Sequence, residues 1–423
     1  MAQDNRSLKS RSALLSASFA FAGLLAYAVM AFSKRALSPS DFSAFSVFWS
    51  FGFFLTATVG FPVEQELSRS VASRDTNELE FGDVVDQAIR IAVLLGAIAI
   101  AMAIGVALGG VLTGLERRVE VLMALAVLIC GESATAVVRG VLAGTRQTLP
   151  FALMVAGQGV VRVTLVVLTL VIAPDGLWPS VAVASSSLTF VLFLGYLLRA
   201  RTNTSPPFGV PGLSQAGLFR LLAAAPFSAV FSVGTPALAG LVAKKAEQAE
   251  IGDVLAALSF TSSPVLVAAA LQTTLLPSLV RSLLVDGDQV VRRSMRRITG
   301  LVVGIFALAA VVINVVGPAL LRLLFGSTPG VGRLALSGMT MAAGLLFLTN
   351  VLTPVCIARR SHALVARAWA LGAAALVLLI NVPGRLADRV AISVLGGAIV
   401  VAGSMVLALN LFWGEGASGS TRD

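Results

Sequence analysis

The sequence predicts an all-α polytopic membrane protein, with about twelve transmembrane helices in two six-helix lobes related by a pseudo-two-fold axis around a central lumen. The first observation is composition: 57% of the 423 residues are hydrophobic, only 12% are charged, and the mean hydropathy is +0.92. Because about a quarter of the residues in an average soluble domain are charged, this chain has too few charges to cover a soluble protein of its size. The second observation is the recurrence of apolar stretches long enough for a transmembrane helix, which needs about 20 residues.

Twelve apolar stretches follow one another, each bounded by charged residues, proline or glycine. They lie at 12–32, 43–63, 88–110, 119–143, 149–173, 178–198, 219–243, 254–280, 298–320, 334–357, 363–382 and 391–413. The first contains the A-x-A pattern of a signal-peptide cleavage site at Ala26–Ala28, but its apolar run continues through Phe32. Since the apolar region of a signal peptide spans only about 7–15 residues, we interpret this stretch as the first span.

The basic residues predict the orientation in the membrane. With a cytoplasmic N-terminus, the cytoplasmic segments hold about twice as many Lys and Arg residues as the outer segments, as the positive-inside rule requires. Both termini are therefore expected in the cytoplasm. This bias accounts for the net charge of +10 without a nucleic-acid partner. The segment 292-RRSMRR is expected to lie against anionic lipid headgroups.

The two halves of the sequence carry a faint repeat. The matching residues, offset by 210 to 212 positions, are Lys34/Arg35 with Lys244/Lys245, Asp41 with Asp253, and Arg69 with Arg281. Their common order favours two parallel repeats of six spans, as in transporters with two pseudo-symmetric lobes. We therefore predict an N-terminal lobe at 1–200, a cytoplasmic linker at 201–218 and a C-terminal lobe at 219–423. The alternative is that basic residues simply flank helices in both halves.

Several enzyme classes and cofactor sites are excluded by missing residues. None of the four lysines follows a glycine, so the chain has no Walker A loop for ATP. The only histidine is His362, with no nucleophile elbow to accompany it. Cys130 and Cys356, in separate apolar spans, are too few for a zinc site and are expected to be packing residues. The sequence thus predicts no enzyme activity, no metal and no cofactor.

Polar side chains inside apolar helices are costly and therefore point to function or to buried pairing. Gln158 and Arg162 are four residues apart, on one face of the fifth span, and Arg162 lies too deep for its side chain to reach the interface easily. In the fourth span Glu132, Arg139 and Arg146 follow one another at intervals of seven and are expected on one face. Two interpretations stay open. Arg162 and Glu132 form a buried structural pair, or Arg162 offers its positive charge to an anionic substrate.

Other polar residues and helix breakers extend the candidate site. Glu64, which follows Pro62, is either interfacial or part of an inner gate, and Glu132 and Glu64 are the candidates for ion coupling. Further lumen candidates, or else partners in interhelical hydrogen bonds, are Gln272, Asn314 and Asn350. Because proline kinks helices, a moving gate is predicted from Pro226, Pro236, Pro264 and Pro277. Two G-x-x-x-G patterns, at Gly105/Gly109 and Gly140/Gly144, predict packing seams.

The stretch 137-VVRGVLAGTRQTLPFALMVAGQGVVRVTLVV resembles the fourth and fifth spans of bacterial polysaccharide exporters and O-antigen-type flippases. These families belong to the superfamily that also contains multidrug extruders and lipid II flippases. The most specific part is R-G-x-L-x-G-x-x-R followed by G-x-x-R, and 37-LSPSDFSAFSVFWSFGFFLTATVGFPVEQELSR and 261-TSSPVLVAAALQTTLLPSLVR add to the resemblance.

The resemblance implies alternating access through a central lumen and an isoprenoid-diphosphate-linked oligosaccharide as substrate, moved from the cytoplasmic to the outer leaflet. It also makes glycan polymerases or glycosyltransferases candidate partners. A cationic cavity can pair with the diphosphate while the prenyl tail stays in lipid. The alternatives are a drug or cation antiporter of the same superfamily, which would favour acidic residues in the lumen, and a non-transport scaffold of a polysaccharide-assembly complex.

Overall fold

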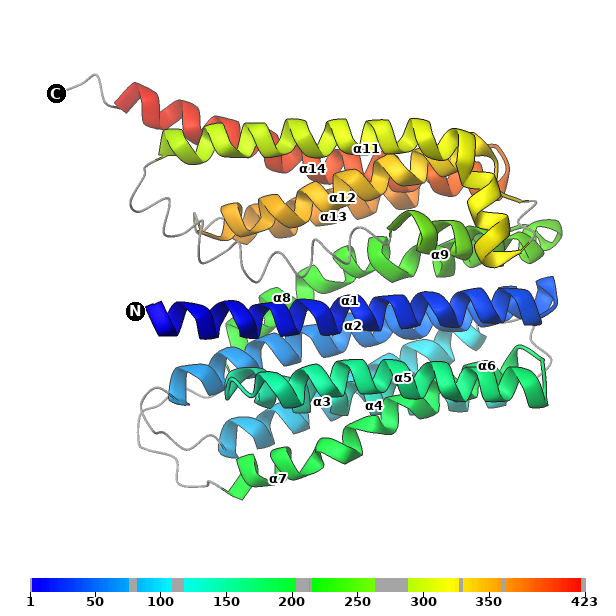
Figure 1. Cartoon of the computed structure of the whole chain (residues 1–423), viewed down its shortest axis with the longest axis horizontal. Coiled ribbons are helices and arrows are strands. Elements are labelled where there is room, and N and C mark those ends of the chain that lie inside the picture. The colour runs from blue at the N-terminus through cyan, green and yellow to red at the C-terminus, as the bar shows by residue number, and fades with distance from the viewer. Residues whose placement is uncertain are drawn as a thin grey trace. The chain divides into compact units, whose positions relative to one another are not determined.

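A computed structural model of the chain is all-helical over the residues that it describes. These residues are 2–75, 82–108, 118–202, 213, 215–262, 288–326, 330–358 and 362–419. Within each part of the chain the long helices run side by side (Figure 1).

The helices alternate with short turns. In the first part they are α1 (Ala2–Ala36), α2 (Pro39–Asp75), α3 (Gly82–Leu108), α4 (Arg118–Gly144), α5 (Thr148–Ile172), α6 (Leu177–Ser186), the 3-10 segment η1 (Ser187–Phe193) and α7 (Leu194–Thr202). They continue with α8 (Gln215–Ala229), the π-helical segment η2 (Val230–Gly234), α9 (Thr235–Val242) and the 3-10 segment η3 (Lys245–Glu250). The last four are α11 (Asp288–Phe325), α12 (Arg333–Ala358), α13 (His362–Leu379) and α14 (Leu386–Gly419).

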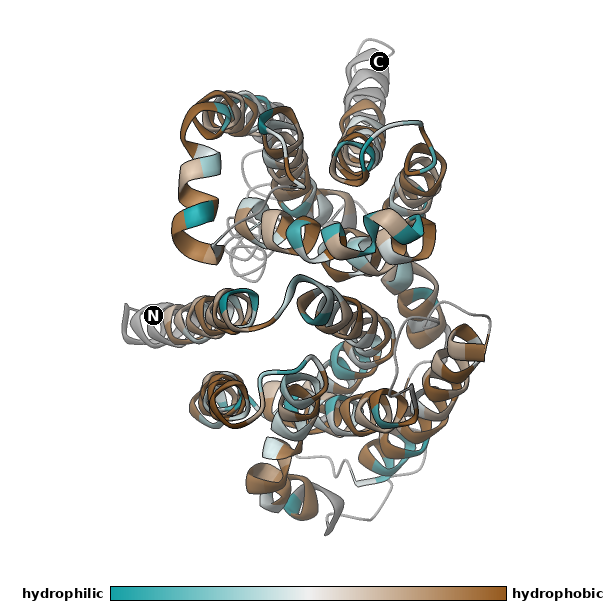
Figure 2. Ribbon diagram, turned by 90° about the vertical axis from the view of Figure 1, so that its right-hand side faces the viewer, coloured by the Kyte–Doolittle hydropathy of each residue, from teal (hydrophilic) through white to brown (hydrophobic). Residues whose placement is uncertain are grey.

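The predicted fold class is confirmed. Among the described residues, ten helical segments are long and apolar enough to cross a membrane, and apolar residues dominate the ribbons (Figure 2). Of the other two predicted spans, one is the shorter apolar helix Ala363–Leu379. The second, at 254–280, is helical as far as residue 262 and otherwise lies outside the described residues, with Pro264, Gln272 and Pro277.

The chain divides into two compact units, Met1–Gly252 and Asp253–Asp423. The helix formed by α8, η2 and α9 belongs to the first unit, because all three segments pack against α2. The sequence instead groups this helix with the second lobe, from residue 219 onward. The division into six plus six helices stays a prediction.

The order of packing inside the two units is nevertheless similar. In the first unit α4 packs against α3 and against α6, η1 and α7, while α5 packs against α6. In the second unit α12 packs in the same way against α11 and α14, and α13 against α14. The same order of neighbours in both halves is what a duplicated chain would produce.

The seam between α2 and α4 is closed by glycines of α4. A Cβ atom on Gly140 would lie 3.1 Å from the carbonyl oxygen of Glu64, and one on Gly144 would lie 2.6 Å from Cβ of Val71 and 2.9 Å from the carbonyl oxygen of Ser68. The predicted packing role of this G-x-x-x-G pattern is thus visible. Gly105 has no atom within 4 Å of its ideal Cβ position, and Gly109 lies outside the described residues.

We expect Gly144→Ala to destabilise the protein, since its methyl group would meet the backbone of α2 and overpacking of this kind costs roughly 1–3 kcal/mol. Gly105→Ala is the matched control, because its methyl group meets no neighbour and alanine favours a helix by about 1 kcal/mol. Thermal unfolding of the purified protein in detergent measures both. A Gly144→Ala variant as stable as the Gly105→Ala variant would contradict the close approach of α2 and α4.

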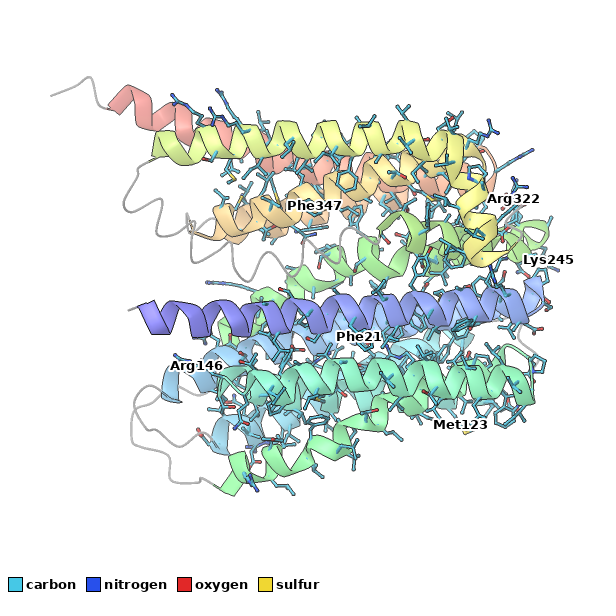
Figure 3. The ribbon with its side chains drawn as sticks, in the orientation of Figure 1. Phe21, Met123, Arg146, Lys245, Arg322 and Phe347 are labelled. Atoms are coloured by element: carbon cyan, nitrogen blue, oxygen red, sulfur yellow. The ribbon has the colours of Figure 1, made fainter. Side chains whose placement is uncertain are left out.

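The end of α4 corrects one expectation. Arg146 was placed on the same helical face as Glu132 and Arg139, but α4 ends at Gly144. Arg146 has a left-handed backbone, with φ of 56°. Its N–H donates to the carbonyl of Ala143, and the N–H of Gln147 donates to that of Leu142, which is the Schellman pattern of a helix end. Arg146 is therefore an exposed turn residue that separates α4 from α5 (Figure 3).

The two prolines of the seventh span flank an irregular segment. Pro226 lies inside α8, and Pro236 lies in the first turn of α9, after the π-helical η2. The hydroxyl of Thr235 donates to the carbonyl of Val230 at 2.8 Å, so it satisfies an acceptor inside this irregular turn. π-helical turns often mark functional positions, and the gate role of these prolines stays a prediction.

Candidate functional site

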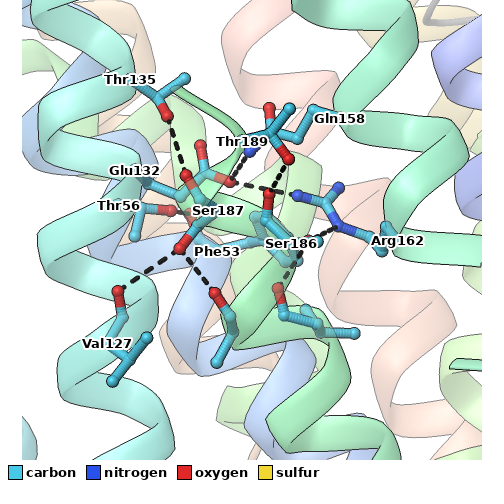
Figure 4. A network of polar contacts seen from close by, with 12 residues as sticks. Phe53, Thr56, Val127, Glu132, Thr135, Gln158, Arg162, Ser186, Ser187 and Thr189 are labelled. Atoms are coloured by element: carbon cyan, nitrogen blue, oxygen red, sulfur yellow. Dashed lines mark hydrogen bonds and ion pairs between the residues drawn. The ribbon is translucent and has the colours of Figure 1, made fainter. Parts of the chain in front are cut away.

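A buried ion pair joins the middle of α4 to the middle of α5. Nη2 of Arg162 lies 3.1 Å from Oε1 of Glu132, and the two side chains are 12% and 10% exposed. The expected partner of Arg162 is therefore the one observed (Figure 4). A guanidinium this deep in an apolar bundle needs such a counter-ion, since an unpaired buried charge is far more costly.

Two further polar groups fix the geometry of the pair. Nε2 of Gln158 donates to the same Glu132 oxygen at 2.7 Å, so this oxygen accepts two hydrogen bonds. Nε of Arg162 donates to Oγ of Ser186 at 3.0 Å, and the Ser186 hydroxyl donates to the carbonyl of Val183. The network therefore links α4, α5 and the end of α6.

The close approach of α6 to α4 depends on Gly131, the residue before Glu132. A Cβ atom on Gly131 would lie 2.0 Å from Oγ of Ser187, the neighbour of Ser186. A side chain at position 131 would therefore displace Ser187, which follows the serine that contacts Arg162. At this point α6 changes to the 3-10 segment η1, and the Ser187 hydroxyl donates to the carbonyl of Ala184 at 2.6 Å.

Two aromatic rings of α2 complete the surroundings of Arg162. Its guanidinium carbon lies 4.9 Å from the ring centroid of Phe53 and 5.8 Å from that of Trp49. The two rings are 4.6 Å apart and tilted by 55°. Contacts of a cation with aromatic faces in a desolvated site are worth up to about 2 kcal/mol, so α2 also contributes to holding this charge.

A second ion pair lies two helical turns away along α4. Nε of Arg139 is 2.9 Å from Oε2 of Glu64, and the side chains are 23% and 18% exposed. The contact is a close ion pair between two partly buried side chains. This pair bridges α4 and α2 at the seam made by Gly140. Together the two pairs hold two positive and two negative charges, and the cluster is formally neutral.

The neighbouring acidic residue Glu66 is 2% exposed and pairs with Arg69 on the same helix. Sequence reasoning leaves Glu64 as either interfacial or part of an inner gate. Both carboxylates are held by arginines, one between helices and one within α2.

Two of the remaining candidates form hydrogen bonds within the second unit. Nδ2 of Asn314 donates to Oγ of Ser337 at 3.1 Å, which links α11 to α12 in the second unit. Nδ2 of Asn350 donates to the carbonyl of Leu346 on its own helix at 2.8 Å. Among the described residues, no group of three or more His, Cys, Asp or Glu side chains is arranged to hold a metal ion.

Sequence reasoning missed Ser186, Trp49 and Phe53. The triple serine 185–187 inside an apolar span was an available signal, because intramembrane hydroxyls often bond across helices. No comparable signal marks the two aromatic residues, since Phe and Trp are ordinary members of an apolar stretch.

No family model matches the chain. Two mycobacterial proteins are similar to it in sequence over almost its whole length. The chain is 26% identical over 397 residues to the Uncharacterized protein Rv3630 of Mycobacterium tuberculosis H37Rv, covering 92% of this chain and 90% of the relative. It is 27% identical over 405 residues to the Uncharacterized protein Rv1510 of the same strain, covering 94% and 91%.

Solved structures give the fold. The MATE transporter VcmN of Vibrio cholerae is similar with a TM-score of 0.64 at 17% identity, over 96% of this chain and 97% of that one. The lipid II flippase MurJ, in an inward closed conformation, also has a TM-score of 0.64, at 12% identity over 94% and 87%. This chain has their fold. The expected resemblance is thereby confirmed at the level of the wider fold, whereas the O-antigen-type family itself stays a prediction.

We expect Arg162→Met to lower stability by roughly 3–5 kcal/mol, because it leaves the Glu132 carboxylate buried without its cation. The double variant Glu132→Gln/Arg162→Met removes both charges and should lose much less than the sum of the single variants. Unfolding midpoints in detergent, taken as a double-mutant cycle, measure the coupling. Arg90→Met, at an exposed arginine of α3, is the control. Additive effects at 132 and 162 would contradict a stabilising pair.

Proposed function

We propose that the protein is a membrane transporter that moves an anionic, lipid-linked glycan precursor between the leaflets of the bacterial inner membrane by alternating access. The observation that carries the proposal is the position of Arg162, in the middle of α5 in a chain with the fold of MATE transporters and MurJ. In this proposal Arg162 receives the diphosphate of the substrate.

The contacts of Arg162 are compatible with such a role. It donates through Nε to Ser186 and through Nη2 to Glu132, while its Nη1 has no hydrogen-bond partner among the described residues. Its side chain is 12% exposed, so it is not fully buried. A phosphate offers the planar guanidinium a bidentate contact that one carboxylate oxygen does not.

The charge balance suggests how binding and ion coupling are connected. Arg162 is neutralised by Glu132 in the conformation described, so an incoming diphosphate has to displace that carboxylate. The released Glu132 would keep its hydrogen bond from Gln158 and become the group that takes up a proton. Glu64 is paired with Arg139, which lies two helical turns from Glu132 along α4, and it offers a second carboxylate for this exchange.

Under this proposal, Arg162→Gln abolishes export of the glycan, with lipid-linked intermediates accumulating on the inner leaflet by roughly tenfold or more. Arg162→Lys keeps part of the activity if a point charge is sufficient, and little if bidentate pairing matters. Surface glycan and leaflet-resolved intermediates are measured in cells depleted of the native protein. Arg90→Gln is the matched exposed control. Normal export by Arg162→Gln, with normal protein levels, would contradict the proposal.

The second candidate is a drug or cation antiporter. The TM-score to the MATE transporter VcmN equals that to MurJ, so the likeness in fold supports this candidate as much as the flippase. The same ion pair can open in the other direction, with a cation taking Arg162's place on Glu132. The two proposals differ in which member of the pair binds substrate.

The discriminating experiment compares Glu132→Gln with Arg162→Gln. The flippase proposal predicts that Arg162→Gln loses glycan export and leaves resistance to cationic dyes unchanged, because dyes are not its substrate. An antiporter would lose dye extrusion in Glu132→Gln, since the neutral amide cannot hold a cation. Dye accumulation and surface glycan are measured in the same strains, and loss of dye extrusion with intact glycan would assign the second function.

A further inference from the structure

Three arginines near the start of α11 are exposed and have no acidic partner among the residues that the structure describes. Arg293, Arg296 and Arg297 lie on the solvent-accessible side of the helix, whereas Met295 between them is 4% exposed. No ion pair or hydrogen bond joins these three side chains to any described residue. Arg69, Arg139 and Arg162 of the first unit, by contrast, each form an ion pair with a glutamate. The three are hereafter called the basic cluster.

The packing of α11 fixes the direction in which the basic cluster points. The buried stripe of the helix, at spacings of seven and four residues, is Met295, Val302, Phe306 and Ala310. These residues face the second unit, where α11 packs against α12. Arg293, Arg296 and Arg297 lie off this stripe, so they are directed away from the unit's core.

The same outward side of α11 continues as a strongly apolar surface. Leu301 is 63% exposed, Ile305 54%, Leu308 66% and Val315 69%. On a helix that is long and apolar enough to cross the membrane, such residues are suited to contact acyl chains. The basic cluster therefore lies about one to two turns beyond the first lipid-facing side chains, at the depth where headgroup phosphates are expected.

We infer that the basic cluster and the adjoining apolar face of α11 form a binding surface for an anionic phospholipid. The phosphate of the headgroup would contact the guanidinium groups, which suit phosphate geometry, and the acyl chains would lie along Leu301, Ile305 and Leu308. An acidic protein segment would match the charge alone, whereas a phospholipid matches the charge and the apolar continuation together.

The test uses the purified full-length chain and vesicles of phosphatidylcholine with increasing phosphatidylglycerol, and it measures which lipid the protein retains. Replacing the cluster by Arg293→Gln/Arg296→Gln/Arg297→Gln should lower the preference for phosphatidylglycerol by roughly fivefold per arginine removed. High salt should weaken the preference of the wild type. Because the cluster is exposed, the variant is expected to remain monodisperse and helical.

A charge-matched control lies at the opposite end of α11. Arg322, Arg333 and Arg385 are exposed residues at the end of α11, the start of α12 and before α14 (Figure 3 labels Arg322). The variant Arg322→Gln/Arg333→Gln/Arg385→Gln should keep the lipid preference. An equal loss in both triple variants, or in neither, would overturn the inference. Displacement of bound lipid by a soluble poly-glutamate peptide would assign the cluster to an acidic protein instead.

This inference does not depend on the proposed transport. Arg162→Gln should retain the preference for phosphatidylglycerol in full, since Arg162 lies in the first unit, whereas the basic cluster lies on α11 in the second. If the cluster variant loses its preference for phosphatidylglycerol but exports glycan normally, the result supports the lipid-binding surface and does not bear on the proposed transport.

Discussion

The ion pair between Arg162 and Glu132 is the constraint on which the first unit depends. A guanidinium in the middle of an apolar helix is tolerable only with a counter-charge and hydrogen bonds close by. The chain supplies these from three other helices: Glu132 on α4, Ser186 on α6, and Trp49 and Phe53 on α2. One charged side chain therefore fixes how four helices meet.

Close backbone approach makes this arrangement possible. Gly131 lets α6 reach α4 beside Glu132, and Gly140 brings α2 against α4 beside the Arg139–Glu64 pair. A methyl group at Gly131 would meet Ser187 next to Ser186, and one at Gly140 would meet the backbone of α2 beside the Arg139–Glu64 pair. The glycines therefore allow the helices to approach closely beside the two ion pairs.

The sequence predicted the helices well because each transmembrane span is a local property of composition and length. It named Glu132 as a possible partner of Arg162 and left open whether Arg162 instead faces a substrate, and the pair is what the structure has. It placed Arg146 wrongly, because a spacing of seven shows a common face only while the helix continues, and α4 ends first. Trp49, Phe53 and Ser186 depend on contacts between distant segments, which no local pattern encodes.

The neutral state of the cluster has a consequence for transport. A lone arginine in the membrane would bind an anion tightly but would then be left uncompensated when the anion departs, whereas a paired arginine can return to its own carboxylate. In the proposed transport cycle, exchange between Glu132 and a substrate phosphate would keep a counter-charge on Arg162 at every stage, and a proton would neutralise the Glu132 carboxylate while the substrate is bound. The pair therefore lowers the cost of an empty site, at the expense of affinity, and a transporter needs that balance because it must also release what it binds.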